Sequence, residues 1–266
     1  MTEFVAELGP CEGSVDYARR AIQALKGTDI AMKVQWYTAD TLVRPGTARY
    51  DRTDDRDIDQ HAMFQTQLSI DEWKMIAREA MSENGVKFFP TVFDETMVDH
   101  AVEVGLDRVK IASGDITHTP LIRTAAQLPE LVISTGAATF SEVQEAVGAA
   151  FDSNPDVKLT LLACHLEYPS RPEDAHIGRI VTLQQTYGVR CQIGYSDHTP
   201  GLGILPSLAL IGIDMWEKHV TLGGVPAVGD HTFAVTVDEM KVARRVIDGV
   251  GRMIGDPNLV PSQGEL

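Results

Sequence analysis

Residues 131–151 read LVISTGAATFSEVQEAVGAAF, and this stretch decides the fold. Its first six residues form a short apolar run with several β-branched side chains, which is typical of a buried strand. Thr139 and Glu142 then fit the S/T-x-x-E capping box that starts a helix. The stretch therefore predicts a strand over residues 131–136, a turn, and a helix over residues 141–151.

The same strand and helix unit recurs along the whole chain. Two further capping boxes, at Ser69 with Glu72 and at Thr236 with Glu239, mark helix starts. We expect strands over residues 4–9, 30–36, 87–93, 108–113, 131–136, 158–165, 191–198 and 213–220. We expect helices over residues 15–25, 69–84, 96–104, 119–127, 141–151, 177–186, 204–211 and 237–253.

Eight such units in about 250 residues predict an α/β fold, the (β/α)8 TIM barrel, in which catalytic groups lie at the C-terminal ends of the strands. An open doubly wound sheet is the alternative. Residues 9–13, GPCEG, follow the first strand and lack the GxGxxG pattern of a dinucleotide-binding sheet. We expect the barrel to occupy residues 1–256 and a short C-terminal tail to occupy residues 257–266.

Charge and composition restrict the class of protein. The 266 residues include 23 Lys and Arg against 38 Asp and Glu, a net charge of −15, which argues against nucleic-acid binding. The longest apolar run is far shorter than the roughly 20 residues of a membrane span, and Glu3 and Glu7 argue against a secretory signal. Three scattered cysteines predict neither a disulfide framework nor a zinc site. We therefore expect a cytoplasmic protein that binds small molecules, and homo-oligomerisation stays open.

The segment over residues 37–68 is too long for an ordinary loop between a strand and a helix. It is rich in Arg, Asp, Thr and Gly, and it is either disordered or a functional flap. Arg44, Arg49, Arg52 and Arg56 are placed to reach an anionic ligand. The alternative is a solvated loop of mixed charge, because aspartates stand close to these arginines.

Two lysines lie within predicted strands, where an unpaired ammonium group is costly to bury. Lys33 and Gln35 share one side of their strand, and Lys110 poses the same problem two strands later. A salt bridge between Lys33 and Glu7 is the structural alternative. With three serines at strand ends, the lysines would form a pocket for a phosphate group; these are Ser113, Ser134 and Ser196. The strands over residues 87–93 and, in part, 131–136 contribute the fewest polar residues.

His198 and His219 end the seventh and eighth predicted strands. As a pair on adjacent strands with Glu217 beside them, they suit a divalent metal that keeps open positions for water and substrate. Nitrogen ligands favour Mn, Co or Zn over Mg. Either histidine alone is more often an ordinary hydrogen-bonded side chain. Asp197 is expected to orient the loop or a metal ligand, with an N-cap for Thr199 as the alternative.

At these residues the sequence resembles the N-acetylneuraminate (sialic acid) synthase family, which condenses phosphoenolpyruvate with an amino-sugar aldose. The matching stretches run in family order across nearly the whole chain. They are Ala6-Glu7-Leu8-Gly9, Met32-Lys33-Val34-Gln35, Lys110-Ile111-Ala112-Ser113-Gly114-Asp115, Ile133-Ser134-Thr135-Gly136-Ala137-Ala138-Thr139, Glu167-Tyr168-Pro169, Gly194-Tyr195-Ser196-Asp197-His198-Thr199 and Glu217-Lys218-His219.

The resemblance implies roles for a subset of residues. His198 and His219 correspond to the metal ligands, with Mn²⁺ as the expected ion and Mg²⁺ or Co²⁺ as alternatives. Glu7 corresponds to the carboxylate that handles a proton of water. The cradle for phosphoenolpyruvate corresponds to Lys33, Lys110, Ser113, Ser134 and Ser196. The side chains that face the sugar correspond to Gln35, Asp115, Tyr168 and Asp230, and Tyr168 and Asp230 are also expected to be catalytic.

The sequence also departs from the family pattern. Pro10 and Cys11 replace the usual Asn-His after the first strand, and Ala163-Cys164-His165 replaces the usual His-Cys-Thr. Leu166 occupies an often polar position, and Asp115 replaces a glutamate. No residues correspond to the family's small antifreeze-like C-terminal domain. A synthase for a non-standard aldehyde acceptor and a non-catalytic anion- or sugar-binding barrel are therefore the alternatives. A metal hydrolase would carry His-x-His on the first strand, where Glu7-Leu8-Gly9 stands.

Overall fold

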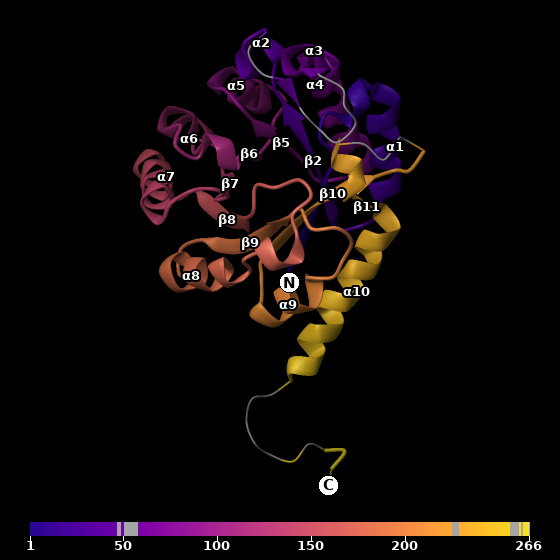
Figure 1. The fold of residues 1–266 in the computed structure, drawn as a ribbon, viewed down its shortest axis with the longest axis vertical. Coiled ribbons are helices and arrows are strands. Elements are labelled where there is room, and N and C mark those ends of the chain that lie inside the picture. The colour runs from indigo at the N-terminus through magenta and orange to yellow at the C-terminus, as the bar shows by residue number, and fades with distance from the viewer. Residues whose placement is uncertain (47–48, 51–57, 225–228, 256–260, 262, 266) are drawn as a thin grey trace.

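The computed structural model describes residues 1–46, 49–50, 58–224, 229–255, 261 and 263–265. Within these residues, eight parallel strands form a closed barrel, because the first strand pairs with both the second and the last (Figure 1). The barrel strands are β1 (Glu3–Glu7), β2 (Ile30–Trp36), β5 (Phe88–Val92), β6 (Arg108–Ile111), β7 (Glu130–Ser134), β8 (Lys158–Cys164), β9 (Gln192–Asp197) and β10 (Met215–Thr221). The predicted TIM barrel is confirmed.

Helices surround the barrel at the predicted places. They are α1 (Val15–Leu25), α4 (Ile70–Arg78), α5 (Glu95–Glu103), α6 (Thr119–Ala125), α7 (Phe140–Ser153), α8 (Gly178–Tyr187), α9 (Leu205–Ile211) and α10 (Val237–Ile254). All three predicted capping boxes form, at the starts of α4, α7 and α10. The helix predicted over residues 69–84 continues from α4 through a π-helical turn, Glu79–Glu83, and Gly85 follows it with a positive φ. Among the described residues, no helix is both long and apolar enough to cross a membrane.

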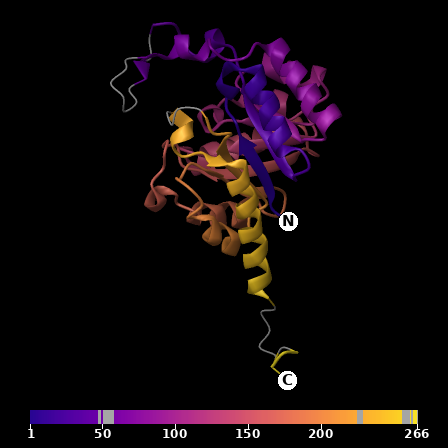
Figure 2. The ribbon, with the colours of Figure 1, turned by 90° about the vertical axis from the view of Figure 1, so that its right-hand side faces the viewer.

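The long helix α10 lies along the outside of the barrel beside β1 (Figure 2). Arg244 of this helix stacks its guanidinium 4.0 Å from the ring centroid of Phe4 and donates a 2.6 Å hydrogen bond to the carbonyl oxygen of Thr2. The helix therefore covers the outside of the barrel where the first and last strands pair. Most of the tail expected over residues 257–266 falls outside the described residues.

The segment over residues 37–68 is more structured than a featureless loop. Its described parts contain α2 (Ala39–Leu42), the strand pair β3 (Arg49–Tyr50) and β4 (Ile58–Asp59), and α3 (Gln60–Phe64). Tyr37 packs edge-on against Phe64 and against Phe93, with ring centroids 5.3 and 5.6 Å apart. The sequence analysis did not predict these short elements, because each spans too few residues for a hydrophobic pattern to repeat.

Of the arginines in this segment, Arg44 is exposed. Arg52 and Arg56 lie outside the described residues, as does the side chain of Arg49. A contact between these arginines and an anionic ligand therefore stays a prediction.

Two successive layers of side chains inside the barrel lead up to its C-terminal end. The lower layer is an apolar floor formed by Val5, Ala31, Phe89, Val132, Leu162 and Met215. Successive side chains of a strand point to opposite faces, so the residue two positions later lies on the same inner side, one layer higher. Those residues are Glu7, Lys33, Thr91, Ser134, Cys164 and Glu217. The strand period therefore places a polar layer directly above the apolar floor, at the C-terminal end of the barrel.

Gly194 of β9 has no room for a side chain at the level of the floor. A Cβ atom there would lie 2.3 Å from the carbonyl oxygen of Met215 and 2.7 Å from a methyl carbon of Leu162. The glycine lets the neighbouring strands approach closely, and Ser196 follows two positions later in the polar layer.

Candidate active site

A cavity of about 420 Å³ opens above the polar layer, at the C-terminal ends of the strands. Eleven of the fourteen predicted site residues line this cavity: Lys33, Gln35, Lys110, Ser113, Asp115, Ser134, Tyr168, Ser196, His198, Glu217 and His219. Of the other three, Glu7 is buried behind Lys33, Asp197 points to the opposite side of β9, and Asp230 lies in a short helix at the mouth. The structure thus brings together side chains from seven strands and their loops.

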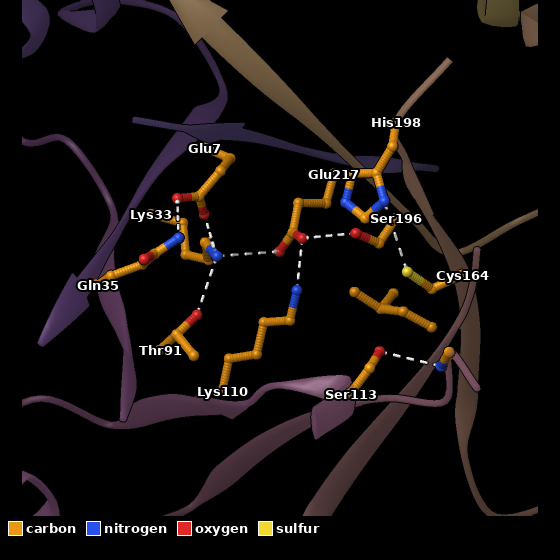
Figure 3. Close-up of polar contacts among 12 residues, drawn as sticks. Glu7, Lys33, Gln35, Thr91, Lys110, Ser113, Cys164, Ser196, His198 and Glu217 are labelled. Atoms are coloured by element: carbon orange, nitrogen blue, oxygen red, sulfur yellow. Dashed lines mark hydrogen bonds and ion pairs between the residues drawn. The ribbon is translucent and has the colours of Figure 1, made fainter. Parts of the chain in front are cut away.

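Four buried charges of alternating sign line the bottom of this cavity, above the apolar floor of the barrel (Figure 3). We call them the charged floor of the cavity; they are Glu7, Lys33, Glu217 and Lys110. The ammonium group of Lys33 contacts Glu7 and lies 3.9 Å from Oε2 of Glu217, while Lys110 contacts Oε1 of Glu217. The structural alternative for Lys33, a salt bridge to Glu7, is therefore present. Glu217 was expected beside the histidines, yet its contacts join the two lysines. Because two ammonium groups face two carboxylates, the cluster is close to neutral overall.

These pairings control the ionisation of the cluster. Burial opposes the charged form of Glu217, but the nearby Lys110 and Lys33 outweigh it and hold the pKa of this carboxyl below its usual range. Burial lowers the pKa of Lys33 to about 7, against the attraction of Glu217. Glu217 thus remains ionised. A further anion in the cavity would stabilise the charged form of Lys33 and raise its pKa.

Glu7 is held from three sides. Its Oε1 accepts hydrogen bonds from the backbone N–H of Gly9 at 2.7 Å and from the side-chain amide of Gln35 at 3.3 Å, and its Oε2 contacts Lys33. Gln35 lines the cavity and therefore links the buried carboxylate to the space above it. The predicted placement of Lys33 and Gln35 on one side of β2 matches this arrangement.

The strand over residues 87–93, predicted to contribute few polar residues, supplies two side chains that line the cavity. Thr91 accepts a hydrogen bond from Lys33 at 2.9 Å, and Phe93 forms part of the wall. The signal in the sequence was weak because a single threonine in an apolar strand is common. Its position two residues after Phe89, in the polar layer, becomes evident only in the barrel.

Gly136 is a second residue of the site that the sequence analysis passed over. Its backbone N–H donates a 2.9 Å hydrogen bond to Oγ of Ser113. A Cβ atom at this position would lie 2.9 Å from that oxygen, 2.9 Å from Cγ of Leu166 and 3.3 Å from Sγ of Cys164. A glycine here lets Ser113 and Leu166 approach the cavity together, because any side chain would push one of them away.

Ser134 has a feature that the other two serines lack. Ser113 accepts from Gly136, and Ser196 donates to Glu217 at 2.8 Å. The hydroxyl of Ser134 is buried, lines the cavity and has no hydrogen-bond partner. An unsatisfied buried hydroxyl is costly, so this side chain favours a ligand oxygen in the cavity.

We therefore expect Ser134→Ala to weaken the binding of phosphoenolpyruvate, the ligand that the family resemblance implies, about tenfold, because the lost hydrogen bond to a charged oxygen contributes about 1.5 kcal/mol. The free energy of unfolding should change little, since no partner is lost in the empty protein. Isothermal titration calorimetry and urea unfolding measure the two effects. Thr160→Val is the matched control: Thr160 is also buried, but it does not line the cavity and its hydroxyl donates to Oε1 of Gln192 at 3.2 Å. Equal losses of stability in the two variants would contradict this expectation.

His198 and His219 face each other at the cavity mouth, with ring centroids 5.6 Å apart. Nδ1 of His198 lies 2.8 Å from the carbonyl oxygen of His165, which can only accept, so Nδ1 carries the proton and Nε2 keeps a free lone pair. Burial and the neighbouring His219 lower the pKa of His198 to about 3, and burial also lowers the pKa of His219. Both rings are therefore neutral, which is the form that binds a metal.

The two imidazoles fit a divalent metal with an open coordination sphere. Within the described part of the chain, no three His, Cys, Asp or Glu side chains are gathered as a complete ligand set. Two neutral nitrogen donors beside a water-accessible cavity leave the remaining positions for water and substrate oxygens. Asp230 lies 3.6 Å from Nδ1 of His219, and the ring of Tyr168 lies 4.2 Å from that of His198.

The remaining predicted residues lie at the rim. Asp115 is partly buried, and this burial raises the pKa of its carboxyl. Tyr168 and Leu166, on the loop after β8, are partly exposed and line the mouth. The entrance thus carries both polar and apolar side chains.

This fold and cavity define a TIM-barrel protein with a polar, charged site at the C-terminal ends of its strands. Residues 20–258 match the model of the NeuB family, and the chain belongs to this family. It is 32% identical over 279 residues to N,N'-diacetyllegionaminic acid synthase of Legionella pneumophila, covering all of this chain and 77% of that protein. It is 30% identical to pseudaminic acid synthase of Helicobacter pylori, over 90% of this chain and 71% of that protein.

A solved structure supports the fold. The N-acetylneuraminic acid synthetase of Leptospira borgpetersenii superposes with a TM-score of 0.85 at 24% identity, over 99% of this chain and 88% of that chain. The family resemblance stated from the sequence is therefore confirmed. The protein is a synthase of the NeuB family, a transferase that uses phosphoenolpyruvate to form a carbon–carbon bond.

Proposed function

We propose that the protein condenses phosphoenolpyruvate with an aldose in an aldol-type reaction that releases phosphate and yields a 2-keto-3-deoxy sugar acid. The observation that carries this proposal is the convergence of Lys33, Lys110 and the unpartnered hydroxyl of Ser134 beside two neutral imidazoles. Lysines and hydroxyls suit the phosphate and carboxylate of phosphoenolpyruvate, and the imidazoles suit a metal.

Phosphoenolpyruvate would occupy the charged floor of the cavity. Lys33 and Lys110 would each contact the ligand while keeping their ion pairs with Glu7 and Glu217. The hydroxyl donors would be Ser113, Ser134 and Ser196. The net charge of −15 does not oppose this binding, because screening limits exposed charges to about 8 Å at physiological salt. The two lysines act in direct contact.

His198 and His219 would hold a divalent metal, with Mn²⁺ as the expected ion and Mg²⁺ or Co²⁺ as alternatives. When bound, such an ion supplies Lewis acidity toward the aldehyde oxygen of the acceptor. Asp197 holds the backbone that follows His198, and Glu217 holds the two lysines beside the metal position. Asp197 would therefore help to position His198, and Glu217 would help to position Lys33 and Lys110.

The reaction balances with one water molecule. Carbon 3 of phosphoenolpyruvate attacks the aldehyde carbon and forms the new C–C bond, while the aldehyde oxygen gains a proton. Water adds at carbon 2 and would give up one proton to Glu7, which lies directly behind the cavity-lining Lys33; this proton balances the one gained by the aldehyde oxygen. The C–O bond to phosphate then breaks and leaves the 2-keto group. General-base help of this kind contributes roughly 10²–10⁴-fold.

The acceptor would lie toward the mouth, where Gln35, Asp115, Tyr168 and Asp230 offer hydrogen-bonding groups to sugar hydroxyls. Tyr168 and Asp230, close to His198 and His219, would also touch the reacting end of the acceptor. An acceptor less polar than a common sugar is the second candidate. It is favoured by the apolar side chains in the cavity wall: Leu42, Phe93 and Leu166.

The test is an incubation of the protein with Mn²⁺, phosphoenolpyruvate labelled with ¹⁸O at the bridging oxygen, and a panel of aldoses and simpler aldehydes. We expect phosphate release that depends on the acceptor, with the label in phosphate and a 2-keto acid three carbons longer than the acceptor. Label retained in the organic product would contradict C–O cleavage. Phosphate release without any acceptor would contradict condensation.

A further inference from the structure

The two three-residue motifs that end in His198 and His219 lie side by side on the neighbouring strands β9 and β10. Ser196-Asp197-His198 ends β9 and Glu217-Lys218-His219 lies in β10, and the register pairs Glu217 with Ser196 and Lys218 with Asp197. The first and last residue of each motif line the cavity. Because side chains alternate along a strand, the two middle residues point to the opposite side, into the layer between strands and helices. Nothing in the proposed reaction uses Lys218.

The two middle residues form a fully buried ion pair. Nζ of Lys218 lies 3.2 Å from Oδ2 of Asp197, and both side chains are 0% exposed. A buried ion pair is weak evidence for stability, because removing two charges from water costs several kcal/mol per ion and an apolar pair often serves equally well. The pair therefore calls for a reason other than stability.

The other contacts of the pair supply that reason. Oδ1 of Asp197 accepts hydrogen bonds from the backbone N–H of Thr199 at 2.9 Å and from its hydroxyl at 2.7 Å. Lys218 donates to the carbonyl oxygen of Thr199. All three polar groups of Thr199, the residue directly after His198, are thus held from the back of the barrel.

His198 is consequently fixed on both sides along the chain. β9 leads up to it, and the held Thr199 follows it. This backbone position directs Nδ1 of His198 to the carbonyl oxygen of His165, at 2.8 Å, and leaves Nε2 facing the cavity.

We propose that Lys218 is a positioning residue: with Asp197 it clamps Thr199 and thereby holds His198 in the ring orientation and tautomer that a metal ligand needs. The clamp itself is independent of the proposed reaction, whereas its effect on metal affinity rests on the proposed metal site.

The experiment uses two variants of the full chain and one control. Lys218→Met removes the donor to Thr199 but leaves the charge of Asp197 unpaired. Asp197→Asn combined with Lys218→Met leaves no buried charge unpaired and keeps one oxygen acceptor for Thr199, although it removes Oδ2, which accepts from Nε1 of Trp216 at 3.3 Å. Lys74→Met is the control, because Lys74 is also buried and pairs with Glu103 at 2.5 Å, far from the cavity on α4.

The first readout needs no metal. Long-range ¹H–¹⁵N spectra of the histidine rings report which nitrogen carries the proton. We expect His198 to show a single Nδ1-protonated tautomer in the parent and the control, and a mixture of tautomers in both clamp variants. An unchanged single tautomer in the folded double variant would overturn the proposal. So would a double variant that fails to fold, because the pair would then be purely structural.

The second readout is the visible absorption of Co²⁺ titrated into each protein. Loss of a residue that orients a metal ligand typically weakens affinity 10–100-fold, and we expect this loss, with a changed absorption band, in both clamp variants. The control should match the parent. A clamp variant that binds Co²⁺ as tightly as the parent would count against the proposal. If the parent itself binds no Co²⁺, the metal site is refuted, and the tautomer spectra alone then test the clamp.

Discussion

Replacing Glu217 by leucine is expected to lower the free energy of unfolding by about 3–5 kcal/mol, the cost of breaking a buried ion pair by removing one partner. Glu217 is the carboxylate that Lys110 contacts and the second one near Lys33, and all three side chains are buried. Leucine fills similar space but leaves two ammonium groups facing each other beside a single remaining carboxylate, Glu7. Urea unfolding at pH 7 measures the loss.

The matched control is Glu217→Gln. Glutamine keeps the oxygen that accepts from Ser196 and Lys110 and loses only the charge, so it should cost clearly less than leucine. Addition of phosphoenolpyruvate should restore part of the stability of the leucine variant, because the ligand returns negative charge to both lysines. A leucine variant as stable as the glutamine variant would show that the lysines do not need this carboxylate.

His219→Ala is expected to lower kcat by about 10³-fold. Lewis acidity toward an aldehyde contributes several kcal/mol, and about 4 kcal/mol corresponds to three orders of magnitude. Binding of phosphoenolpyruvate should change much less, because its lysines and serines lie on the floor and His219 at the mouth. Acceptor-dependent phosphate release gives kcat, and calorimetry gives the affinity for phosphoenolpyruvate.

The control for this variant is His100→Ala. His100 lies on the outer helix α5, where its Nδ1 is 3.4 Å from Glu103, and it does not line the cavity, so its loss should leave kcat unchanged. Metal dependence separates the explanations further. If the activity that remains in His219→Ala is still fully abolished by a chelator and restored by Mn²⁺ at the parent concentration, His219 does not hold the metal.

Much of the fold follows from local sequence patterns. The capping boxes at Ser69, Thr139 and Thr236 each start a helix as predicted, because a cap needs only residues three positions apart. The predicted ends of the strands differ more from the structure. The strand predicted over residues 131–136 stops at Ser134, because the backbone after it turns away to place the N–H of Gly136 on Ser113.

The sequence predicted most of the residues that line the site, but not which of them contact one another. Unusual residue types, such as a lysine within an apolar strand or a histidine at a strand end, identified Lys33, Lys110, His198 and His219. Thr91 gave no such signal, because threonine is ordinary in a strand. Its contribution depends on Lys33 of the neighbouring strand, which it contacts at 2.9 Å.

The sequence by itself determined that the chain alternates strands and helices eight times, and that lysines, serines and histidines stand where those strands end. These properties are periodic or local, so they need no knowledge of distant contacts. Only the tertiary structure decided that Glu217 lies between two lysines and that Lys218 holds Thr199 from the back. The physical reason is closure: pairing β1 with β10 brings residues 7, 33, 110 and 217 into one buried layer, where charge must be neutralised by whichever partner lies within reach.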